Sequence, residues 1–235
     1  MKRPFSLSPR LAAVAELVPQ GTRLADVGTD HGRLPVWLIQ HGVVERAVAS
    51  DLRPGPLSRA RALAERWAVA DRISFRLCDG LSGIGSEEAR TVTVAGMGGE
   101  TIAEILAAAP WTREGDMTLV LQPMSSISNL RLWLSQNGYQ IVVEELAREG
   151  DTLYTALLVR TGEMAPLTPA ELWAGRNSAG PLRGQWLDLW LGKTERALAG
   201  LAQSRQESAP QRRRELEQVR NGLLDMKKEW EAWQR

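Results

Sequence analysis

The sequence predicts an α/β fold with a mainly parallel sheet, followed by an antiparallel helical hairpin. Short apolar runs typical of strands alternate with helix-like runs as far as residue 136. The strand-like runs are largely non-alternating, as expected for parallel strands that are covered on both faces. Strands and helices that alternate with short links favour a doubly wound sheet. Two long helical stretches dominate the last 50 or so residues, roughly a fifth of the chain.

The elements of the sheet region follow from local signals. A first helix is expected from Ser8-Pro9, because Pro at the first helical position has no amide hydrogen to lose and Ser8 can cap free amides. Five parallel strands are expected at residues 23–27, 46–50, 73–77, 91–95 and 117–121. Helices are expected at residues 34–40, 56–68, 101–109 and 127–136. Two more strands, residues 140–145 and 152–160, have no helix between them, which predicts an antiparallel hairpin at one sheet edge.

A segment rich in Pro, Thr and Gly, residues 161–169, interrupts this pattern. We expect a domain boundary there, with residues 1–162 in the sheet domain and residues 163–235 in a helical domain. Apolar residues then recur three and four positions apart, as in a coiled-coil seam: Leu216, Val219, Leu223, Met226, Trp230 and Trp233. An earlier helical stretch, residues 185–203, carries Trp186 and Trp190, and residues 204–211 separate the two stretches. Two helices with a short connection predict a hairpin whose seam and tryptophans pack within the chain.

Composition excludes several classes of protein. The formal net charge is +1, so any basic surface must be local. No apolar run is long enough to span a bilayer. The chain has a single cysteine, Cys78, which excludes an internal disulfide. Its only histidines are His31 and His41, so a Cys/His zinc site is not expected. We therefore expect a cytoplasmic protein with no metal and no membrane partner, and the packing of the helical seam within the chain favours a monomer.

Polar and glycine-rich links fall at the carboxyl ends of the expected parallel strands, where open α/β sheets bind ligands. These links are residues 26–32, 51–55, 79–81 and 96–99. Asp51 follows Gly28 by about twenty residues, the offset at which an acidic side chain accepts hydrogen bonds from ribose hydroxyls. The sequence therefore predicts a cofactor that contains ribose.

The first of these links, Gly28-Thr29-Asp30-His31-Gly32, lacks the glycine pattern of dinucleotide-binding loops. Such loops place a pyrophosphate on a helix N-terminus, and Asp26 and Asp30 would repel it. S-adenosylmethionine carries no phosphate but has a sulfonium and an ammonium cation, which suit an acidic loop. The alternative gives Asp26 and Gly28 only strand-end and turn roles. The recurrence of the pattern at successive strand ends favours the cofactor.

Four segments carry a resemblance to a known family. They are Asp-Val-Gly-Thr-Asp-His-Gly-Arg-Leu-Pro at residues 26–35, Asp-Gly-Leu at 79–81, Ala-Gly-Met-Gly-Gly at 95–99 and Leu-Gln-Pro at 121–123. The whole chain resembles the bacterial tRNA (adenine-22-N1)-methyltransferases. It departs from them at Met124, where the family typically has Asn, and at Thr155, where the family often has Glu. Both departures lie near the mouth of the expected active site.

The resemblance implies a Rossmann-like class I methyltransferase with a seven-stranded, mainly parallel sheet and a C-terminal coiled-coil domain. It implies S-adenosylmethionine as cofactor and methyl transfer to N1 of adenine 22 in tRNA. The residues expected to bind the cofactor are Asp26, Gly28, Asp30, His31, Asp51, Leu52, Asp79, Gly80, Leu81, Gly96 and Met97. Asp51 is expected to bind the ribose and Asp79 the adenine amino group, although each could instead be a turn residue. His31 could instead cap the following helix.

Asp30 is the candidate catalytic residue. Methylation of neutral adenine at N1 produces a cation, and a nearby carboxylate stabilises that charge as it develops. The alternative role of Asp30 is to bind the ammonium group of the cofactor. The segment 96–99 lacks the Asn/Asp-Pro-Pro-aromatic sequence that holds an exocyclic nitrogen. This favours a ring nitrogen as acceptor, for which the enzyme mainly positions the reactants, although the glycines also suit a tight turn.

The residues expected to contact the substrate are Arg10, Gly98, Gly99, Gln122, Pro123, Tyr154, Arg212, Arg213 and Arg214. Gln122 would read a base edge or cap the backbone, and Tyr154 would stack on a flipped adenine or pack in its strand. The arginines would meet tRNA phosphates, but interspersed glutamates also fit a solvated helix face.

Two further classes of function stay open. A methyltransferase for a small molecule or a protein needs no basic surface that extends from the cofactor pocket to the hairpin. A non-catalytic, RNA-binding relict of the fold would bind no cofactor.

Overall fold

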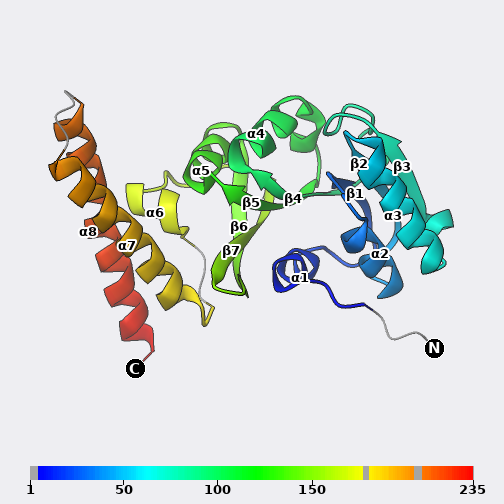
Figure 1. Cartoon of the computed structure of the whole chain (residues 1–235). Helices are drawn as coiled ribbons and strands as arrows, with labels where there is room; N and C mark the ends of the chain where they lie inside the picture. Colours follow the sequence, from blue (N-terminus) through cyan, green and yellow to red (C-terminus); the bar gives the residue numbers. More distant parts are fainter. Residues whose placement is uncertain (1–4, 177–179, 204–207, 235) are drawn as a thin grey trace.

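A computed structural model describes residues 5–176, 180–203 and 208–234. Its core is a seven-stranded sheet in the order β3-β2-β1-β4-β5-β7-β6 (Figure 1). The strands are β1 (Thr22–Val27), β2 (Val44–Asp51), β3 (Ile73–Leu77), β4 (Thr91–Gly98), β5 (Thr118–Ser125), β6 (Tyr139–Glu149) and β7 (Thr152–Thr161). Strands β1 to β5 are parallel, whereas β7 is antiparallel to both β5 and β6. The predicted α/β fold and its edge hairpin are confirmed.

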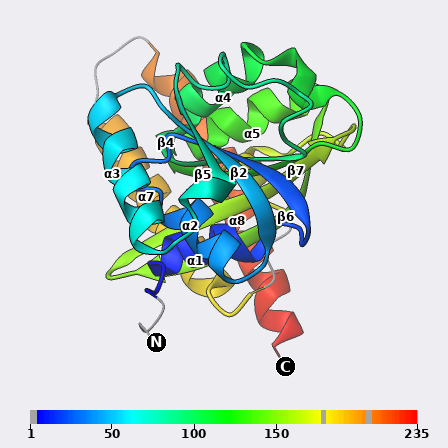
Figure 2. The same cartoon turned by 90° about the vertical axis from the view of Figure 1, so that its right-hand side faces the viewer.

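Helices cover both faces of the sheet (Figure 2). They are α1 (Pro9–Glu16), α2 (Arg33–Gln40), α3 (Pro54–Arg66), α4 (Gly99–Ala107) and α5 (Ile127–Gln136), with 3-10 turns η1 (Ala70–Arg72) and η2 (Pro110–Arg113). One apolar layer joins α4 and α5 to the sheet through residues such as Ile102 and Leu130. The other joins α1, α2 and α3 to the opposite face through Val14, Leu38 and Ala64.

The predicted elements occur with ends shifted by a few residues. On the site side, β4 continues to Gly98 rather than ending at Ala95, and β5 continues to Ser125 rather than ending at Leu121. The capping role expected for Ser8 is wrong, because its side chain makes no capping hydrogen bond and its buried Oγ has no partner. Proline at the first position is therefore the signal that starts α1.

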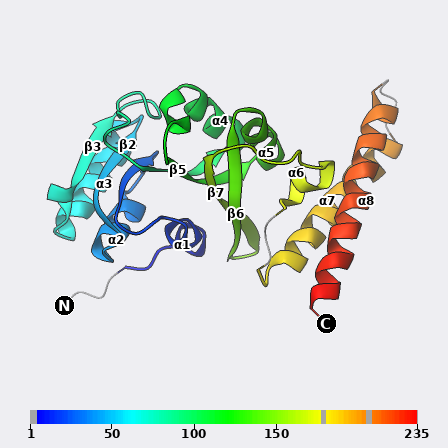
Figure 3. The ribbon, with the colours of Figure 1, turned by 180° about the vertical axis from the view of Figure 1, so that it is seen from behind.

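Beyond the β6 edge lie α6 (Pro169–Ala174), α7 (Arg183–Ala202) and α8 (Ala209–Trp233). Helices α7 and α8 run side by side in opposite directions, as the views from the front and from behind show (Figures 1 and 3). The predicted hairpin is confirmed, although residues 204–207 of its expected break lie outside the described part of the chain. Trp186, Val219 and Leu223 pack inside it. Trp233 does not belong to the seam, since 88% of its surface is exposed.

Helix α6 was not predicted. Its six residues begin with a capping box, in which Thr168 accepts from the N–H of Glu171 and the Glu171 side chain accepts from the N–H of Thr168. The small residues Ala170 and Ala174 let α6 pack against the hairpin core. The helix therefore sits between the sheet and the hairpin and contacts both α5 and α8.

A buried polar joint connects α6 to the sheet. Arg131 of α5 is fully buried and donates hydrogen bonds to the carbonyls of Leu172 and Trp173, at 2.9 and 3.0 Å. Its Nη2 also donates to Oε2 of Glu144 on β6, at 2.5 Å. Gly175 closes the joint with a φ of +77°, and a Cβ there would collide with the Glu144 carboxylate. The division at residue 162 stays a prediction, but this joint fixes the helices next to it against the sheet.

Candidate active site

A cavity of about 790 Å³ opens at the carboxyl ends of the first four parallel strands. Twelve of the residues selected from sequence line it: Arg10, Asp26, Gly28, Asp30, His31, Asp51, Leu52, Asp79, Gly80, Leu81, Gly96 and Met97. All eleven residues expected to bind the cofactor are in this group. They come from links that are far apart in the sequence, so the topology of the sheet is what brings them together.

Asp26, the last residue but one of β1, lies in a small buried network. Its two carboxylate oxygens accept hydrogen bonds from the hydroxyls of Thr29 and Thr93, at 2.6 and 2.7 Å. Burial is the main reason that the pKa of Asp26 is raised to about 6, and the nearby Asp51 carboxylate raises this pKa further. The hydrogen bonds from the two hydroxyls act in the opposite direction and lower it. The carboxylate therefore braces the β1 loop against β4.

Backbone N–H groups from the loop after β1 and from the loop after β2 donate hydrogen bonds to the end of β2. The N–H of Asp30 donates to Oδ2 of Asp51 at 3.2 Å, and the N–H of Arg53 donates to Oδ1 at 3.0 Å. The N–H of Thr29 donates to the carbonyl of Ser50 at 2.8 Å. Asp51 is thus held rigidly with its carboxylate at the cavity wall.

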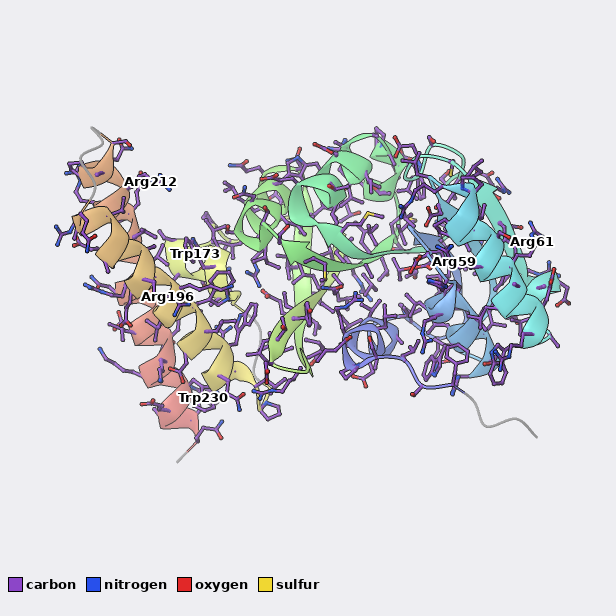
Figure 4. The ribbon with its side chains drawn as sticks, in the orientation of Figure 1. Arg59, Arg61, Trp173, Arg196, Arg212 and Trp230 are labelled. Atoms are coloured by element: carbon purple, nitrogen blue, oxygen red, sulfur yellow. The ribbon has the colours of Figure 1, made fainter. Side chains whose placement is uncertain are left out.

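Asp30 has a φ of +49°, a left-handed conformation that is uncommon for a residue other than glycine. Its side chain is exposed, and its carboxylate lies 3.6 Å from Nε2 of His31 and 3.9 Å from Nη2 of Arg59. Arg59 lies on the side of α3 that faces β1, whereas Arg61 lies on the outer side (Figure 4). His31 does not cap α2, because Gly32 occupies the N-cap position. The loop therefore presents an exposed carboxylate at the rim of the cavity.

Gly28 has a φ of +67°, and a Cβ at this position would collide with Cε of Met97. The tip of Met97 thus lies directly over the Gly28 backbone. The two loops predicted to meet the cofactor, after β1 and within β4, touch each other at this point. An alanine at Gly28 would be strained by its backbone conformation as well as by this contact.

Eight of the nine residues expected to contact the substrate lie outside the cavity lining, and five of them come before residue 162: Gly98, Gly99, Gln122, Pro123 and Tyr154. A Cβ on Gly99 would lie 2.5 Å from the carbonyl oxygen of Ser126, and one on Gly98 would lie 3.2 Å from Oγ of Ser125. These glycines let β4 approach the β5–α5 link closely, which supports the turn alternative. The Gln122 side chain is fully buried and bonded to its neighbours, so the structure favours its backbone-capping role over base reading.

The arginine cluster lies far from this cavity. Arg212 is at the start of α8, at the end of the molecule opposite α3 (Figure 4). Arg213 pairs with Glu217 at 3.1 Å, as helical neighbours four residues apart do. Arg212 and Arg214 are exposed. The cluster therefore lies outside the cavity that gathers the other predicted residues.

Sequence reasoning missed three residues that shape the site: Thr29, Thr93 and Arg59. Thr29 lies in the same loop as Asp30, and its spacing of three from Asp26 was a usable signal. Thr93 lies on the neighbouring strand β4, and no local pattern links it to Asp26. Arg59 is one of three arginines in α3, so only the fold shows that it faces Asp30.

Comparison with known proteins agrees with this geometry. The methyltransferase-domain family matches residues 7–157. A Bacillus subtilis relative, tRNA (adenine(22)-N(1))-methyltransferase, is 36% identical over 159 residues, which are 68% of this chain and 67% of the relative. The chain belongs to the tRNA (adenine-22-N1)-methyltransferase family.

Solved structures of this family extend the likeness to almost the whole chain. The crystal structure of the B. subtilis m1A22 tRNA methyltransferase TrmK has a TM-score of 0.81 and 30% identity, covering 94% of this chain and 99% of that one. Streptococcus pneumoniae Sp1610, solved in complex with S-adenosyl-L-methionine, has a TM-score of 0.79 and 30% identity, covering 92% and 100%. The helical unit is thus shared with the family as well as the sheet.

The described residues contain no group of three or more His, Cys, Asp or Glu residues that could hold a metal ion. None of the helices in the described ranges is both long and apolar enough to cross a membrane.

Proposed function

We propose that this protein transfers a methyl group from S-adenosylmethionine to N1 of adenine 22 in tRNA. The observation that carries the proposal is the acidic cavity at the carboxyl ends of β1 to β4, in a chain that belongs to this methyltransferase family. The named activity of the B. subtilis relative and the S-adenosylmethionine complex of the S. pneumoniae relative support the same reaction.

The cavity fits this cofactor. Gly28 leaves its backbone covered only by the flexible end of Met97, so a ligand can approach it closely. The Asp51 carboxylate is fixed by two backbone N–H groups and has lone pairs left for ribose hydroxyls. Asp30 and Asp79 add exposed carboxylates that suit cationic groups and an amino group. When bound, S-adenosylmethionine supplies an electrophilic methyl group on a sulfonium.

The residues of this chain then have to place the acceptor and balance its charge. Adenine N1 has a lone pair in the plane of the ring, so no side chain needs to remove a proton before it attacks. Gly96, which lines the cavity and has no side chain, lets a flat base come close to the cofactor site. Asp30 at the rim stabilises the positive charge that forms on the methylated ring.

The helical unit supplies a second surface for tRNA. Arg212 and Arg214 are exposed on α8 and can meet phosphates, which give affinity without reading sequence. The apolar seam residues Val219 and Leu223 are buried within the chain, which supports a monomer. We place its action in the cytoplasm, where tRNA is modified, and without a metal.

One assay tests the reaction. The purified protein is incubated with radiolabelled S-adenosylmethionine and an unmodified tRNA transcript, and the labelled nucleoside is identified after digestion. We expect 1-methyladenosine from a transcript with adenine at position 22 and none from the same transcript with guanine there. Failure to form 1-methyladenosine, while a known family enzyme works in parallel, contradicts the proposal. Label in another nucleoside contradicts the choice of N1.

A further inference from the structure

Arg10 lies where several elements of the site meet. It belongs to the first turn of α1, which packs against β6 and β7. Its guanidinium carbon is 5.7 Å from the centre of the Tyr154 ring, and its Nη1 donates a 2.6 Å hydrogen bond to Oε1 of Gln122. Its backbone N–H donates to Oε2 of Glu149 at 3.3 Å. The guanidinium is therefore half-buried at the cavity wall and bonded to a residue inside the site.

The Gln122 side chain links Arg10 to β4. The same Oε1 that accepts from Arg10 accepts from the N–H of Gly96 at 3.1 Å, and Nε2 donates to the carbonyl of Pro123 at 2.9 Å. Both ends of the amide are engaged, so its orientation is fixed. A charged donor makes a stronger hydrogen bond than a neutral one, so Arg10 is the partner that holds the amide oxygen in place.

Gly96 is the point at which β4 becomes irregular. The pairing of β4 with β5 shifts register between Ala95 and Met97, and Gly96 has a φ of +82°. Gln122 satisfies the Gly96 N–H at this shift. Met97 follows at once and covers Gly28 at the cavity wall. One line of contacts thus runs from Arg10 through Gln122 and Gly96 to the place where the two cavity loops touch.

We propose that Arg10 is a positioning residue for methyl transfer, which acts by holding Gln122 and, through it, the Gly96 turn. The inference rests on the proposed function. In-line transfer depends on how the two reactants are placed, and an error of about 1 Å can cost about 100-fold in rate. This positioning role takes the place of the tRNA phosphate contact that the sequence predicts for Arg10, because the guanidinium is paired with Gln122.

The test compares steady-state methylation of tRNA by the full-length protein and by Arg10→Ala, Arg10→Lys and a control, Arg46→Ala. Arg46 is exposed near the amino end of β2, away from the cavity. We expect Arg10→Ala to lower kcat about 10- to 100-fold, with KM for tRNA changed less than about twofold. Arg10→Lys should recover part of kcat, because its ammonium can still donate to Gln122 but is not planar. The control should match the unchanged protein.

A second readout separates positioning from phosphate binding. Arg10→Ala should leave unchanged the slope of log affinity for tRNA against log salt, and also the dissociation constant of S-adenosylmethionine. A slope reduced by about one with kcat retained identifies a phosphate contact and overturns the inference. If Arg10→Ala does not fold, Arg10→Met takes its place, because methionine keeps an apolar stem but has neither the charge nor the donor. A methionine variant with an unchanged salt slope and a lowered kcat supports positioning, and one with a reduced slope and full kcat overturns it.

A double-mutant cycle tests the route through Gln122. If Arg10 acts through that amide, Arg10→Ala combined with Gln122→Ala should lower kcat no more than the larger single loss. Losses that multiply contradict this route. If the protein without substitutions is inactive, the proposed reaction is contradicted. If that protein is active and Arg10→Ala is equally active, only this inference is contradicted.

Discussion

Asp30 stands out at the residue scale because its backbone is left-handed and its carboxylate is exposed at the cavity rim. The Arg59 guanidinium lies 3.9 Å from the carboxylate, so part of the Asp30 charge is already balanced before substrate binds. Two roles remain for it: stabilising the charge on the methylated base and binding the cofactor's ammonium group. They differ in which kinetic constant they affect.

We expect Asp30→Ala and Asp30→Asn each to lower kcat about 100-fold or more, because either change removes the charge that opposes the developing cation. The measurement is kcat together with the dissociation constant of S-adenosylmethionine. Asp116→Asn, on an exposed side chain before β5, is the control. A weaker cofactor affinity with kcat preserved at saturation would assign Asp30 to the ammonium instead. Near-normal values of both would remove it from the site.

Asp26 predicts a pH dependence of stability. Its pKa is raised from 3.8 to about 6 in the folded protein, so the native state holds an extra proton between those values. The free energy of unfolding should therefore fall as pH rises through this window, by about 3 kcal/mol for this group. Asp26→Asn should remove that fall, measured by urea unfolding from pH 4 to pH 7. Asp71→Asn, on an exposed residue, should not. Parallel profiles for all three proteins would contradict the raised pKa.

At the scale of elements, apolar runs were enough to predict the strands and most helices, because burial on both sheet faces requires a local run of apolar residues. Two features have no such run. Strand β4 continues through Gly96 and Gly98, and glycines contribute nothing to an apolar pattern. Helix α6 is shorter than two turns, so only its capping residues identify it. Contacts such as Arg10 with Gln122 join residues 112 positions apart and follow only from the completed sheet.

The Arg131–Glu144 joint predicts a large loss of stability when it is broken. Arg131→Met should lower the free energy of unfolding by about 3–5 kcal/mol, because it leaves the buried Glu144 charge without its partner. The double variant with Glu144→Gln should recover part of that loss. Arg213→Ala breaks an exposed pair and should cost less than about 1 kcal/mol. Urea unfolding measures all three, and equal small losses would show that the joint contributes little.

On the scale of the whole molecule, the cavity and the arginine cluster lie at opposite ends. Replacing Arg212 and Arg214 with alanine should weaken tRNA binding and lower the slope of log affinity against log salt by about one to two. Turnover at saturating tRNA should stay the same, because the cavity is untouched. Arg23→Ala, at the amino end of β1, is the control. Affinity unchanged at low salt would make the cluster a solvated helix face.

The whole site shows where sequence reasoning stops. Strand-end loops placed every expected cofactor residue at one cavity, since parallel topology forces those loops together. The same reasoning did not locate the residues that contact the base, because Gly98, Gly99 and Gln122 serve packing between β4 and β5. A glycine or a glutamine is the same residue type whether it serves a turn or a binding site. Only its neighbours in the folded structure distinguish the two roles.

The buried Arg131 guanidinium has a thermodynamic consequence for the molecule. It donates to carbonyls of α6 and to a carboxylate of β6 at the same time, so unfolding of α6 would remove two hydrogen-bond partners from a guanidinium that is fully buried. We therefore expect the sheet and the terminal helices to unfold in one cooperative transition, in which the calorimetric and van't Hoff enthalpies of the chain coincide.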